Sequence, residues 1–267
     1  MPSILSCPIC QQPLTLHDQS WKCTHQHSFD QAKEGYINLL PVQFKHSKTP
    51  GDAQNMVDAR KQFLAQGHYH PLLEHIQYWL KEHHSAIDNL LDIGCGEGYY
   101  TRHLNSLAKQ VWGLDIAKTA IKKAAKADPF GKYIVASSHH LPIQNQSIDL
   151  ISRIFAPLYV PEILRCLKPN GIVMSVVPGP RHLWQLRELI YDDVRLHDDT
   201  AVTIKGMQCI ANYPLSYTMP LSPQERQWLM TMTPFAWKLD DESRLKFTES
   251  ERSVEAEFNL QFYQFSN

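Results

Sequence analysis

The stretch LDIGCGEGYY, residues 91–100, decides the fold. A short apolar run ends at Asp92, and three glycines follow at alternate positions, Gly94, Gly96 and Gly98. Glycine tolerates left-handed backbone and lets another molecule approach the chain closely. A strand, a glycine-rich turn and a helix in this order are typical of a nucleotide-binding α/β unit. The stretch therefore predicts a ligand site where the strand ends.

Strand and helix signals alternate after this loop. Short apolar runs predict strands at 89–94, 110–115, 132–137, 147–155 and 170–178, and helical patterns lie between them at 99–108, 116–127 and 160–167. Buried strands that alternate with helices indicate a parallel sheet covered on both faces, a doubly wound α/β fold. Such sheets bind ligands at the carboxyl ends of their strands.

The acids around the glycines favour one kind of ligand. A dinucleotide site has Gly-x-Gly-x-x-Gly and holds a pyrophosphate, which the carboxylates of Asp92 and Glu97 would repel. They suit S-adenosylmethionine, which is positively charged and has no phosphate. Asp115 ends the second strand, where an acid can accept both ribose hydroxyls. The third strand ends in polar residues expected beside the adenine, namely Ser137, Ser138 and His139. The order of these features predicts a Rossmann-like class I S-adenosylmethionine-dependent methyltransferase, although the glycines alone would also fit a purely structural turn.

The fourth strand ends in RIFAP, residues 153–157, in place of the Asn-Pro-Pro-aromatic tetrad that methylators of exocyclic amines often carry. This favours a ring nitrogen, a carbon or a small molecule as the methyl acceptor. Three aromatic residues, Phe155, Tyr159 and Trp184, are candidates for stacking on a base, with a role in the core as the alternative. No residue of the sequence identifies itself as the general base.

The amino-terminal segment has the spacing of a zinc site. Cys7 and Cys10 are two residues apart, and Cys23 follows with two histidines, His25 and His27, close behind. Tetrahedral zinc takes paired ligands from two tight turns. The segment has few apolar residues of its own, so metal binding is expected to order it, and four protein ligands leave no open position for catalysis. Scattered buried thiols are the alternative.

Composition places the rest of the chain among ordinary globular proteins. Of 267 residues, 43% are hydrophobic and 20% charged, with a net charge of −1. Any RNA contact must therefore be local. No signal peptide or membrane span is expected, so the sequence predicts a cytoplasmic protein. Pro41, Pro50 and Gly51 predict a linker or exposed loop over residues 36–52. Its basic cluster, Lys45, His46 and Lys48, could contact phosphate, but a solvated linker is the favoured interpretation.

The expected organisation is a zinc-binding domain over residues 1–35 and a methyltransferase domain over 36–267. The second comprises a linker and lid-like helices (36–85), the nucleotide-binding core (86–180) and a carboxy-terminal part that completes the sheet (181–267). Helical patterns cover 53–65 and 71–82, and Tyr69 lies between them, where a loop can fold over a ligand. Residues 221–237 are expected to pack against the body and to form a wall for the substrate.

The chain resembles the RlmA-type 23S rRNA (guanine-N1)-methyltransferases, in particular the Gram-negative type. The resemblance covers nearly the whole chain and rests on CPIC, KEGYINLLPVQ, PGD, GHY, LDIGCGEGYYT, GLDIAK, VASSHHLP, PGPRHL and MTPFAW. It implies methylation of N1 of a guanine in a hairpin of 23S rRNA, with S-adenosylmethionine and Zn²⁺ as cofactors. The zinc ligands that it implies are Cys7, Cys10, Cys23 and His27. The cofactor contacts that it implies are Tyr69, Gly96, Glu97 and His182.

Two other functions stay open at this point. One is a small-molecule methyltransferase with a structural zinc knuckle, and the other is a non-catalytic RNA-binding adaptor. An RNA enzyme should lose substrate affinity steeply with salt and on deletion of residues 1–35, whereas a small-molecule enzyme should do neither. The nucleotide position, the oligomeric state, with a homodimer as one option, and the choice between free rRNA and an assembling particle are also open.

Overall fold

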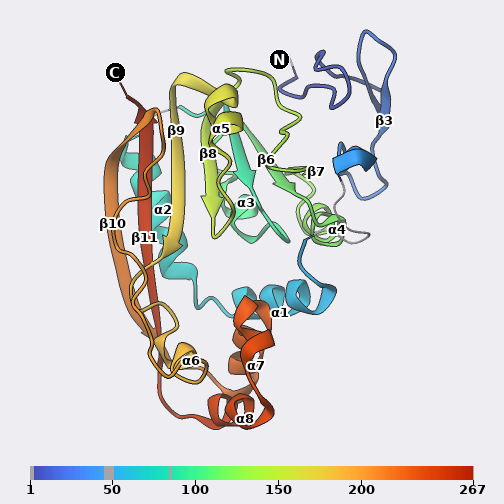
Figure 1. Cartoon of the computed structure of the whole chain (residues 1–267). Coiled ribbons are helices and arrows are strands. Elements are labelled where there is room, and N and C mark those ends of the chain that lie inside the picture. Colours follow the sequence, from blue (N-terminus) through green and yellow to red (C-terminus); the bar gives the residue numbers. More distant parts are fainter. Residues whose placement is uncertain (1–2, 45–50, 84–85, 267) are drawn as a thin grey trace.

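The computed structural model describes residues 3–44, 51–83 and 86–266, and an eight-stranded sheet forms its centre (Figure 1). The strand order is β10-β11-β9-β8-β5-β6-β7-β4. These strands are β4 (Ile37–Asn38), β5 (Asn89–Ile93), β6 (Gln110–Asp115), β7 (Lys132–Val135), β8 (Ile148–Ile154), β9 (Leu167–Pro178), β10 (Met207–Met219) and β11 (Val254–Phe265). The strands from β4 to β9 run parallel, and β11 and β10 complete the sheet as antiparallel strands. The strand order reverses between β5 and β8, which is where such sheets bind ligands.

Helices cover both faces of the sheet, as the buried apolar strands require. They are α2 (His70–His83), α3 (Tyr99–Leu104), α4 (Lys118–Ala127), α5 (Val160–Cys166) and the short α6 (Trp184–Arg187). Leu90 and Leu150 of the sheet share a core with α2 and α3. Leu91 and Ile151 point to the opposite face and share a core with α5. Burial is nearly continuous along β5, β6 and β8, as in a parallel sheet covered on both faces, so the predicted α/β fold is confirmed.

Two further helices lie beyond the carboxyl ends of the parallel strands, α1 (Gln54–Ala65) and α7 (Pro223–Met232) (Figure 1). They pack against each other although they are far apart in the sequence. Arg60 of α1 donates from Nη2 to the carbonyl oxygen of Met232, at 3.2 Å. The loop before α2 is held as well, because His68 Nε2 lies 2.8 Å from Glu225 Oε1. The helix predicted at 53–65 is therefore α1. Together, α1 and α7 form a roof that covers the end of the sheet.

One expectation for the peripheral segments is wrong, and one helix there was not predicted. The sequence predicts a linker over residues 36–52, but Tyr36, Leu39 and Leu40 are buried and β4 pairs with β7 at the edge of the sheet. Burial of the apolar side chains of INLL stabilises this segment within the fold. This stabilisation outweighs the tendency of the nearby proline and glycine residues to form an exposed loop. The helix α8 (Asp241–Glu249) has no expected counterpart, because it is mostly exposed and its apolar pattern is weak. The basic cluster at residues 45–48 lies outside the described residues.

The amino-terminal segment forms a three-stranded antiparallel sheet of β1 (Thr15–His17), β2 (Ser20–Lys22) and β3 (Ser28–Asp30). The segment before it packs on the main domain. Leu5 and Leu14 are fully buried in the same core as Ile143, and Ser6 N–H donates to the carbonyl oxygen of Pro142 at 3.0 Å. Two short 3-10 helices, η1 (Val42–Phe44) and η2 (Pro234–Lys238), complete the elements. Among the helices of the described residues, none is long and apolar enough to cross a membrane.

Candidate active site and metal centre

A cavity of about 840 Å³ opens at the carboxyl ends of the parallel strands. Most of the predicted cofactor residues line it: Tyr69, Gly94, Gly96, Glu97, Asp115, Ser138, His139 and His182. Asp92 and Gly98 are not among its lining residues. Arg60 of α1, Met232 of α7 and Phe235 of η2 close the other side, so the expected substrate wall within 221–237 does border the cavity. An apolar cavity with a few polar groups is typical of a small-molecule site.

The three glycines of the loop are required for different reasons. All have left-handed backbone, with φ of 71° at Gly94, 57° at Gly96 and 80° at Gly98. A Cβ on Gly94 would lie 2.5 Å from Ala156 Cβ, and one on Gly98 would lie 2.9 Å from a side chain of α4. Packing alone therefore excludes side chains at those two positions. The nearest atom to a Cβ on Gly96 would be 3.8 Å away. Gly96 is thus the glycine that leaves room for a ligand.

Asp92 supports the glycine loop from inside the protein. The sequence places it at the cofactor site, but it does not lie on the cavity wall. Its side chain is 2% exposed and accepts hydrogen bonds from Thr101 Oγ1 at 2.6 Å and Ser152 Oγ at 2.5 Å. These bonds join β5 to α3 and to β8. Burial raises the pKa of Asp92 to about 6, although the two hydroxyl groups oppose the rise. Asp92 does not line the cavity, and both of its carboxylate oxygens accept hydrogen bonds from the protein, so Asp92 positions the loop.

This raised pKa predicts a pH-dependent stability that Asp92→Asn removes. Between its ordinary pKa of 3.8 and the folded pKa of about 6 the folded state holds a proton that the unfolded state has released. The free energy of unfolding therefore falls as pH rises through that window. We expect the variant to gain about 2–3 kcal/mol relative to the wild type between pH 4 and pH 7. Urea unfolding of both proteins across this range measures the difference, and a constant difference would contradict the assignment.

Asp115 stands at the end of β6, as predicted, and is half-buried. Its Oδ2 accepts the Gly96 N–H at 3.0 Å and its Oδ1 accepts the Ala117 N–H at 2.7 Å. Burial raises the pKa of this carboxyl group, and the two backbone donors oppose the rise. Each carboxylate oxygen can accept a second hydrogen bond. The residue therefore anchors the glycine loop and still has acceptor capacity toward the cavity.

Glu97 is a buried carboxylate that is only partly satisfied. Its Oε2 lies 3.2 Å from Arg102 Nη1, but its Oε1 has no hydrogen-bond partner in the part of the chain that the structure describes. The side chain is 2% exposed, and burial raises its pKa while Arg102 opposes the rise. A buried acceptor without a donor is costly and rare in folded proteins. A ligand with an N–H group would satisfy it.

His182 presents a neutral imidazole to the cavity. Burial, together with the neighbouring His197, lowers its pKa to about 3. Its Nδ1 accepts the backbone N–H of Glu257 at 3.3 Å, so the proton resides on Nε2, which can donate to a ligand. Tyr69 packs edge-to-face on Phe258, with ring centroids 5.1 Å apart, on the same wall. This wall is therefore aromatic and carries a hydrogen-bond donor.

Of the aromatic residues proposed to stack on a base, Phe155 is the one that lines the cavity. It is 43% exposed and its φ of 56° is strained for a bulky residue, a feature that clusters at functional sites. Tyr159 lies beside His139, with ring centroids 4.7 Å apart, and Trp184 packs under the guanidinium of Arg181 at 4.2 Å. These two residues do not line the cavity.

The sequence interpretation missed the charged residues that α1 and β8 contribute. Arg60 and Arg153 both line the cavity. Arg153 lies within the apolar run LISRIF, and an arginine at a buried position of a central strand is a usable signal because charges are seldom buried there. Arg60 gave no such signal, since arginine on a helix is usually solvated.

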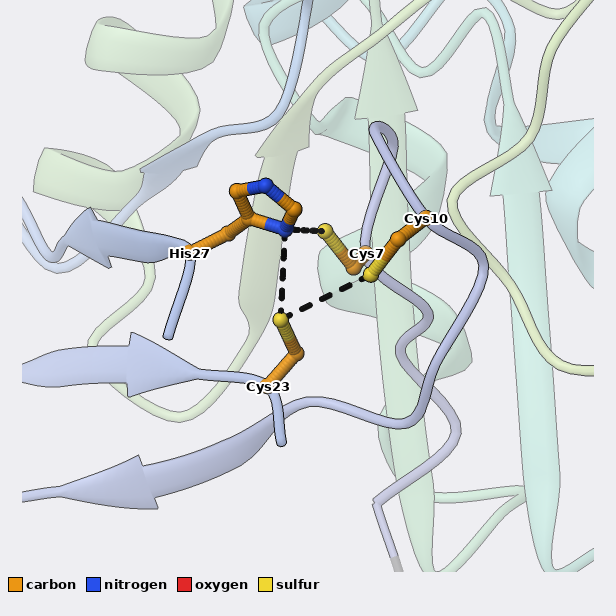
Figure 2. Close-up of side chains that lie close together, drawn as sticks. All are labelled: Cys7, Cys10, Cys23 and His27. Carbon is orange, nitrogen blue, oxygen red and sulfur yellow. Dashed lines mark hydrogen bonds between the residues drawn. The ribbon is translucent and has the colours of Figure 1, made fainter. Parts of the chain in front are cut away.

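The four predicted zinc residues meet at one point beside the three-stranded sheet (Figure 2). The ligand atoms of Cys7, Cys10, Cys23 and His27 all lie within 4.8 Å of one another. His27 Nδ1 is 3.5 Å from Cys7 Sγ and 3.4 Å from Cys23 Sγ, and the sulfurs of Cys10 and Cys23 are 3.6 Å apart. Tetrahedral zinc with Zn–S bonds of about 2.3 Å needs sulfur separations of about 3.8 Å. The donor set and its spacing fit structural zinc, and His25 is outside the group.

Both turns that carry these ligands contain a strained residue. Gln11, directly after Cys10, has φ of 63°, and Gln26, directly before His27, has φ of 64°. Their N–H groups donate to Cys7 O and Cys23 O, at 2.9 and 3.0 Å. Left-handed backbone at a residue other than glycine costs free energy. A metal bound between the two turns supplies the stabilisation that the few apolar residues there do not.

Two family models match parts of the chain that coincide with these two sites. The description "RlmA, N-terminal", a zinc ribbon, matches residues 5–48, and "Methyltransferase domain" matches residues 91–175. The first includes the four metal-binding candidates, and the second includes the glycine loop, Asp115 and the end of β8. The predicted methyltransferase fold and S-adenosylmethionine dependence agree with the second model, and the predicted zinc site agrees with the first.

Full-length relatives decide the family. The 23S rRNA (guanine(748)-N(1))-methyltransferase of Streptomyces fradiae is 30% identical over 248 residues, which cover 88% of this chain and 86% of that protein. A proposed 23S rRNA (guanine-N1)-methyltransferase of Bacillus subtilis is 32% identical over 254 residues, 88% of this chain and 87% of that protein. The chain belongs to this family. The resemblance seen in the sequence is thereby confirmed, and the zinc ribbon and the cavity are the two sites of an rRNA guanine-N1 methyltransferase family member.

Proposed function

We infer that this methyltransferase transfers a methyl group from S-adenosylmethionine to N1 of a guanine in 23S rRNA. The observation that carries the inference is the identity of 30% and 32%, over 88% of the chain, to proteins described by that activity. A target in a hairpin of the RNA is part of the proposal. Guanine pairs through N1, so the target base must leave any pairing and enter the cavity.

The cavity wall has groups that fit each part of S-adenosylmethionine. Glu97 Oε1 lacks a donor among the described residues and suits the ammonium group, and the Nε2–H of His182 suits the carboxylate. Asp115 has acceptor capacity for the ribose hydroxyls. Gly94, Gly96, Ser138 and His139 are assigned to the same contact surface, with Tyr69 on the aromatic wall. When bound, the cofactor supplies a methyl carbon made electrophilic by the sulfonium charge.

The protein's own contribution is alignment and exclusion of water. Reaction requires N1 in line with the methyl carbon and its sulfur, and most of the acceleration comes from that placement. The roof of α1 and α7 closes the cavity on the side of Arg60 and Met232. Phe155 is proposed as the platform on which the base stacks. Asp92 and Gly98, which the sequence also assigns to the cofactor site, are proposed to hold the loop in place, because neither lines the cavity.

The zinc ribbon is proposed to be structural, with Cys7, Cys10, Cys23 and His27 as ligands and no open coordination position. The division into residues 1–35 and 36–267 is likewise proposed. Its supporting observation is the separate sheet of β1 to β3. The partner is 23S rRNA and the proposed location is the cytoplasm. A homodimer stays a prediction, which sedimentation of the protein with and without rRNA tests.

The function is tested with protein-free 23S rRNA from cells that lack the enzyme. We expect incubation with labelled S-adenosylmethionine and the purified protein, followed by mass analysis of nucleosides, to yield 1-methylguanosine. A methylated base other than 1-methylguanosine would overturn the assignment of the atom. Label in small molecules of a cell extract, with none in RNA or ribosomal particles, would favour the small-molecule alternative.

A further inference from the structure

Arg153 is a buried arginine on the cavity wall at the carboxyl end of β8. It is 8% exposed. Its Nε donates to Ser175 Oγ at 3.0 Å and its Nη1 donates to the carbonyl oxygen of Ala156 at 2.7 Å. A guanidinium has five N–H donors, and within the described residues no hydrogen bond uses Nη2. One edge of the group is therefore fixed by the protein while donors are left for a molecule in the cavity.

No carboxylate among the described residues balances this charge. In that part of the chain Arg153 forms no ion pair, and the titratable group that acts on it is Tyr263 of β11. Two histidines, His182 and His197, line the same cavity. His182 is neutral, and burial lowers the pKa of His197. A buried charge without a partner is strongly unfavourable. Such a group is expected where a ligand supplies negative charge or strong acceptors.

A second donor without a partner lies on the same face of the sheet. Asn259 is 2% exposed, and its Nδ2 has no hydrogen-bond partner in the described structure. Ser175 pairs with Arg153 on one side and with Gln261 on the other, and Asn259 lies two residues before Gln261. Residues two apart on a strand share a face. Arg153 and Asn259 therefore share a face of the sheet on which donors lack partners among the described residues, and of the two Arg153 lines the cavity.

The acids of the cavity lie elsewhere. Asp52 and Glu97 are each paired with an arginine, and Asp115 is held by the glycine loop. Among the described residues that line the cavity, none at the end of β8 and β9 is a carboxylate. Guanine N1 bears an amide-like proton that ionises above neutral pH, so methylation needs either a base or a group that stabilises the anion. This end of the cavity offers donors, which suit the anion.

We propose that Arg153 is a catalytic residue that donates to O6 of the target guanine and stabilises the negative charge that develops when N1 loses its proton. The proposal rests on the function inferred above. Arginine paired with guanine O6 and N7 is the commonest specific contact to this base. Adenine has an amino group in place of O6, so the same contact rejects adenine. Preorganised donors aimed at developing charge are worth most in a site that excludes water.

The step balances without a further reactant. The N1 proton leaves to water, and the negative charge spreads over N1 and O6 beside the guanidinium. The N1 lone pair forms the bond to the methyl carbon. The bond from that carbon to sulfur breaks, its electron pair stays on sulfur, and the sulfonium becomes a neutral thioether. Arg153 keeps its protons and its charge throughout.

The test is single-turnover methylation of 23S rRNA from pH 6 to pH 10 by the wild type, Arg153→Gln and Arg153→Lys. We expect Arg153→Gln to be slower by roughly 100-fold at pH 7. Its rate should keep rising at high pH, where guanine ionises without help, so the deficit shrinks. Arg153→Lys retains a charge and should recover part of the rate. Affinity for S-adenosylmethionine, measured by calorimetry, should stay unchanged in both.

Arg226→Gln is the matched control, since Arg226 is 1% exposed, donates to the carbonyl oxygens of Leu221 and Arg252, and does not line the cavity. It should lower stability and leave the shape of the pH profile unchanged. The proposal is wrong if Arg153→Gln has the wild-type rate or loses the same factor at every pH. If the wild type forms no 1-methylguanosine, the function itself fails, and the proposal fails with it.

Discussion

Replacing Asp115 by alanine is expected to weaken binding of S-adenosylmethionine by at least about 100-fold. Two hydrogen bonds from ribose hydroxyls to a carboxylate are worth about 1.5–3 kcal/mol each. The same change removes the acceptor for the N–H groups of Gly96 and Ala117, so the glycine loop also loses its anchor. Asp115→Asn keeps one acceptor oxygen and should lie between alanine and the wild type. Calorimetric titration of each purified protein measures the affinity.

Asp128 provides the control for this experiment. It also accepts two backbone N–H groups, from Phe130 and Gly131 at 3.0 Å each, but it does not line the cavity. Asp128→Ala should lower the free energy of unfolding while leaving the affinity for S-adenosylmethionine unchanged. Wild-type affinity in Asp115→Ala would remove this residue from the cofactor site.

Replacing Cys23 by alanine is expected to release zinc and unfold the ribbon while the cofactor still binds. Structural zinc contributes on the order of 10–16 kcal/mol of apparent binding free energy in zinc-finger peptides. That is more than the few apolar residues of β1 to β3 can replace. Because Cys23 shares its core with Leu5 and Leu14, the main domain should lose stability as well. Metal analysis and thermal unfolding with and without a chelator measure both effects.

Cys166→Ala separates loss of metal from loss of a buried thiol. Cys166 is fully buried in the same core and does not belong to the metal cluster. The Cys166→Ala variant should be less stable than the wild type, keep one zinc per chain and respond to a chelator as the wild type does. One zinc per chain in purified Cys23→Ala would exclude Cys23 from the ligand set.

The sequence predicts the features that depend on local pattern. The apolar runs around residues 89–93 and 110–115 form parallel strands because both of their faces are buried, which is why their hydrophobicity is nearly continuous. Cys7, Cys10 and Cys23 stand at spacings that metal geometry restricts, so the amino-acid sequence alone is enough to group them. Asp115 is predictable because a strand end has a fixed place in such a sheet.

Features that depend on tertiary contacts cannot be predicted in the same way. Asp92 is held by the hydroxyls of Thr101 and Ser152 and does not line the cavity, and nothing in the local pattern around these two residues points to that contact. Gly98 is glycine because α4 packs against it, not because a ligand does. The role proposed for Arg153 depends on the lack of a carboxylate around it among the described residues. The sequence of a single segment cannot reveal that lack.

The integration of the ribbon also changes how the RNA function should be tested. From the sequence, deletion of residues 1–35 should distinguish an RNA enzyme from a small-molecule enzyme. The deletion would expose the core that Leu5 and Leu14 share with Ile143, so either enzyme would lose activity through misfolding. The salt dependence of rRNA binding by the intact chain distinguishes them without that complication.

The most direct test of the central claim is a reverse-transcription map of 23S rRNA from cells that lack the enzyme, after treatment with S-adenosylmethionine and the purified protein. A methyl group on N1 blocks base pairing, so the transcript stops there. One new stop at a single guanine is expected with the wild type and none with Asp115→Ala. A map without any new stop, from a protein that binds the cofactor and is given both free rRNA and ribosomal particles, would contradict it.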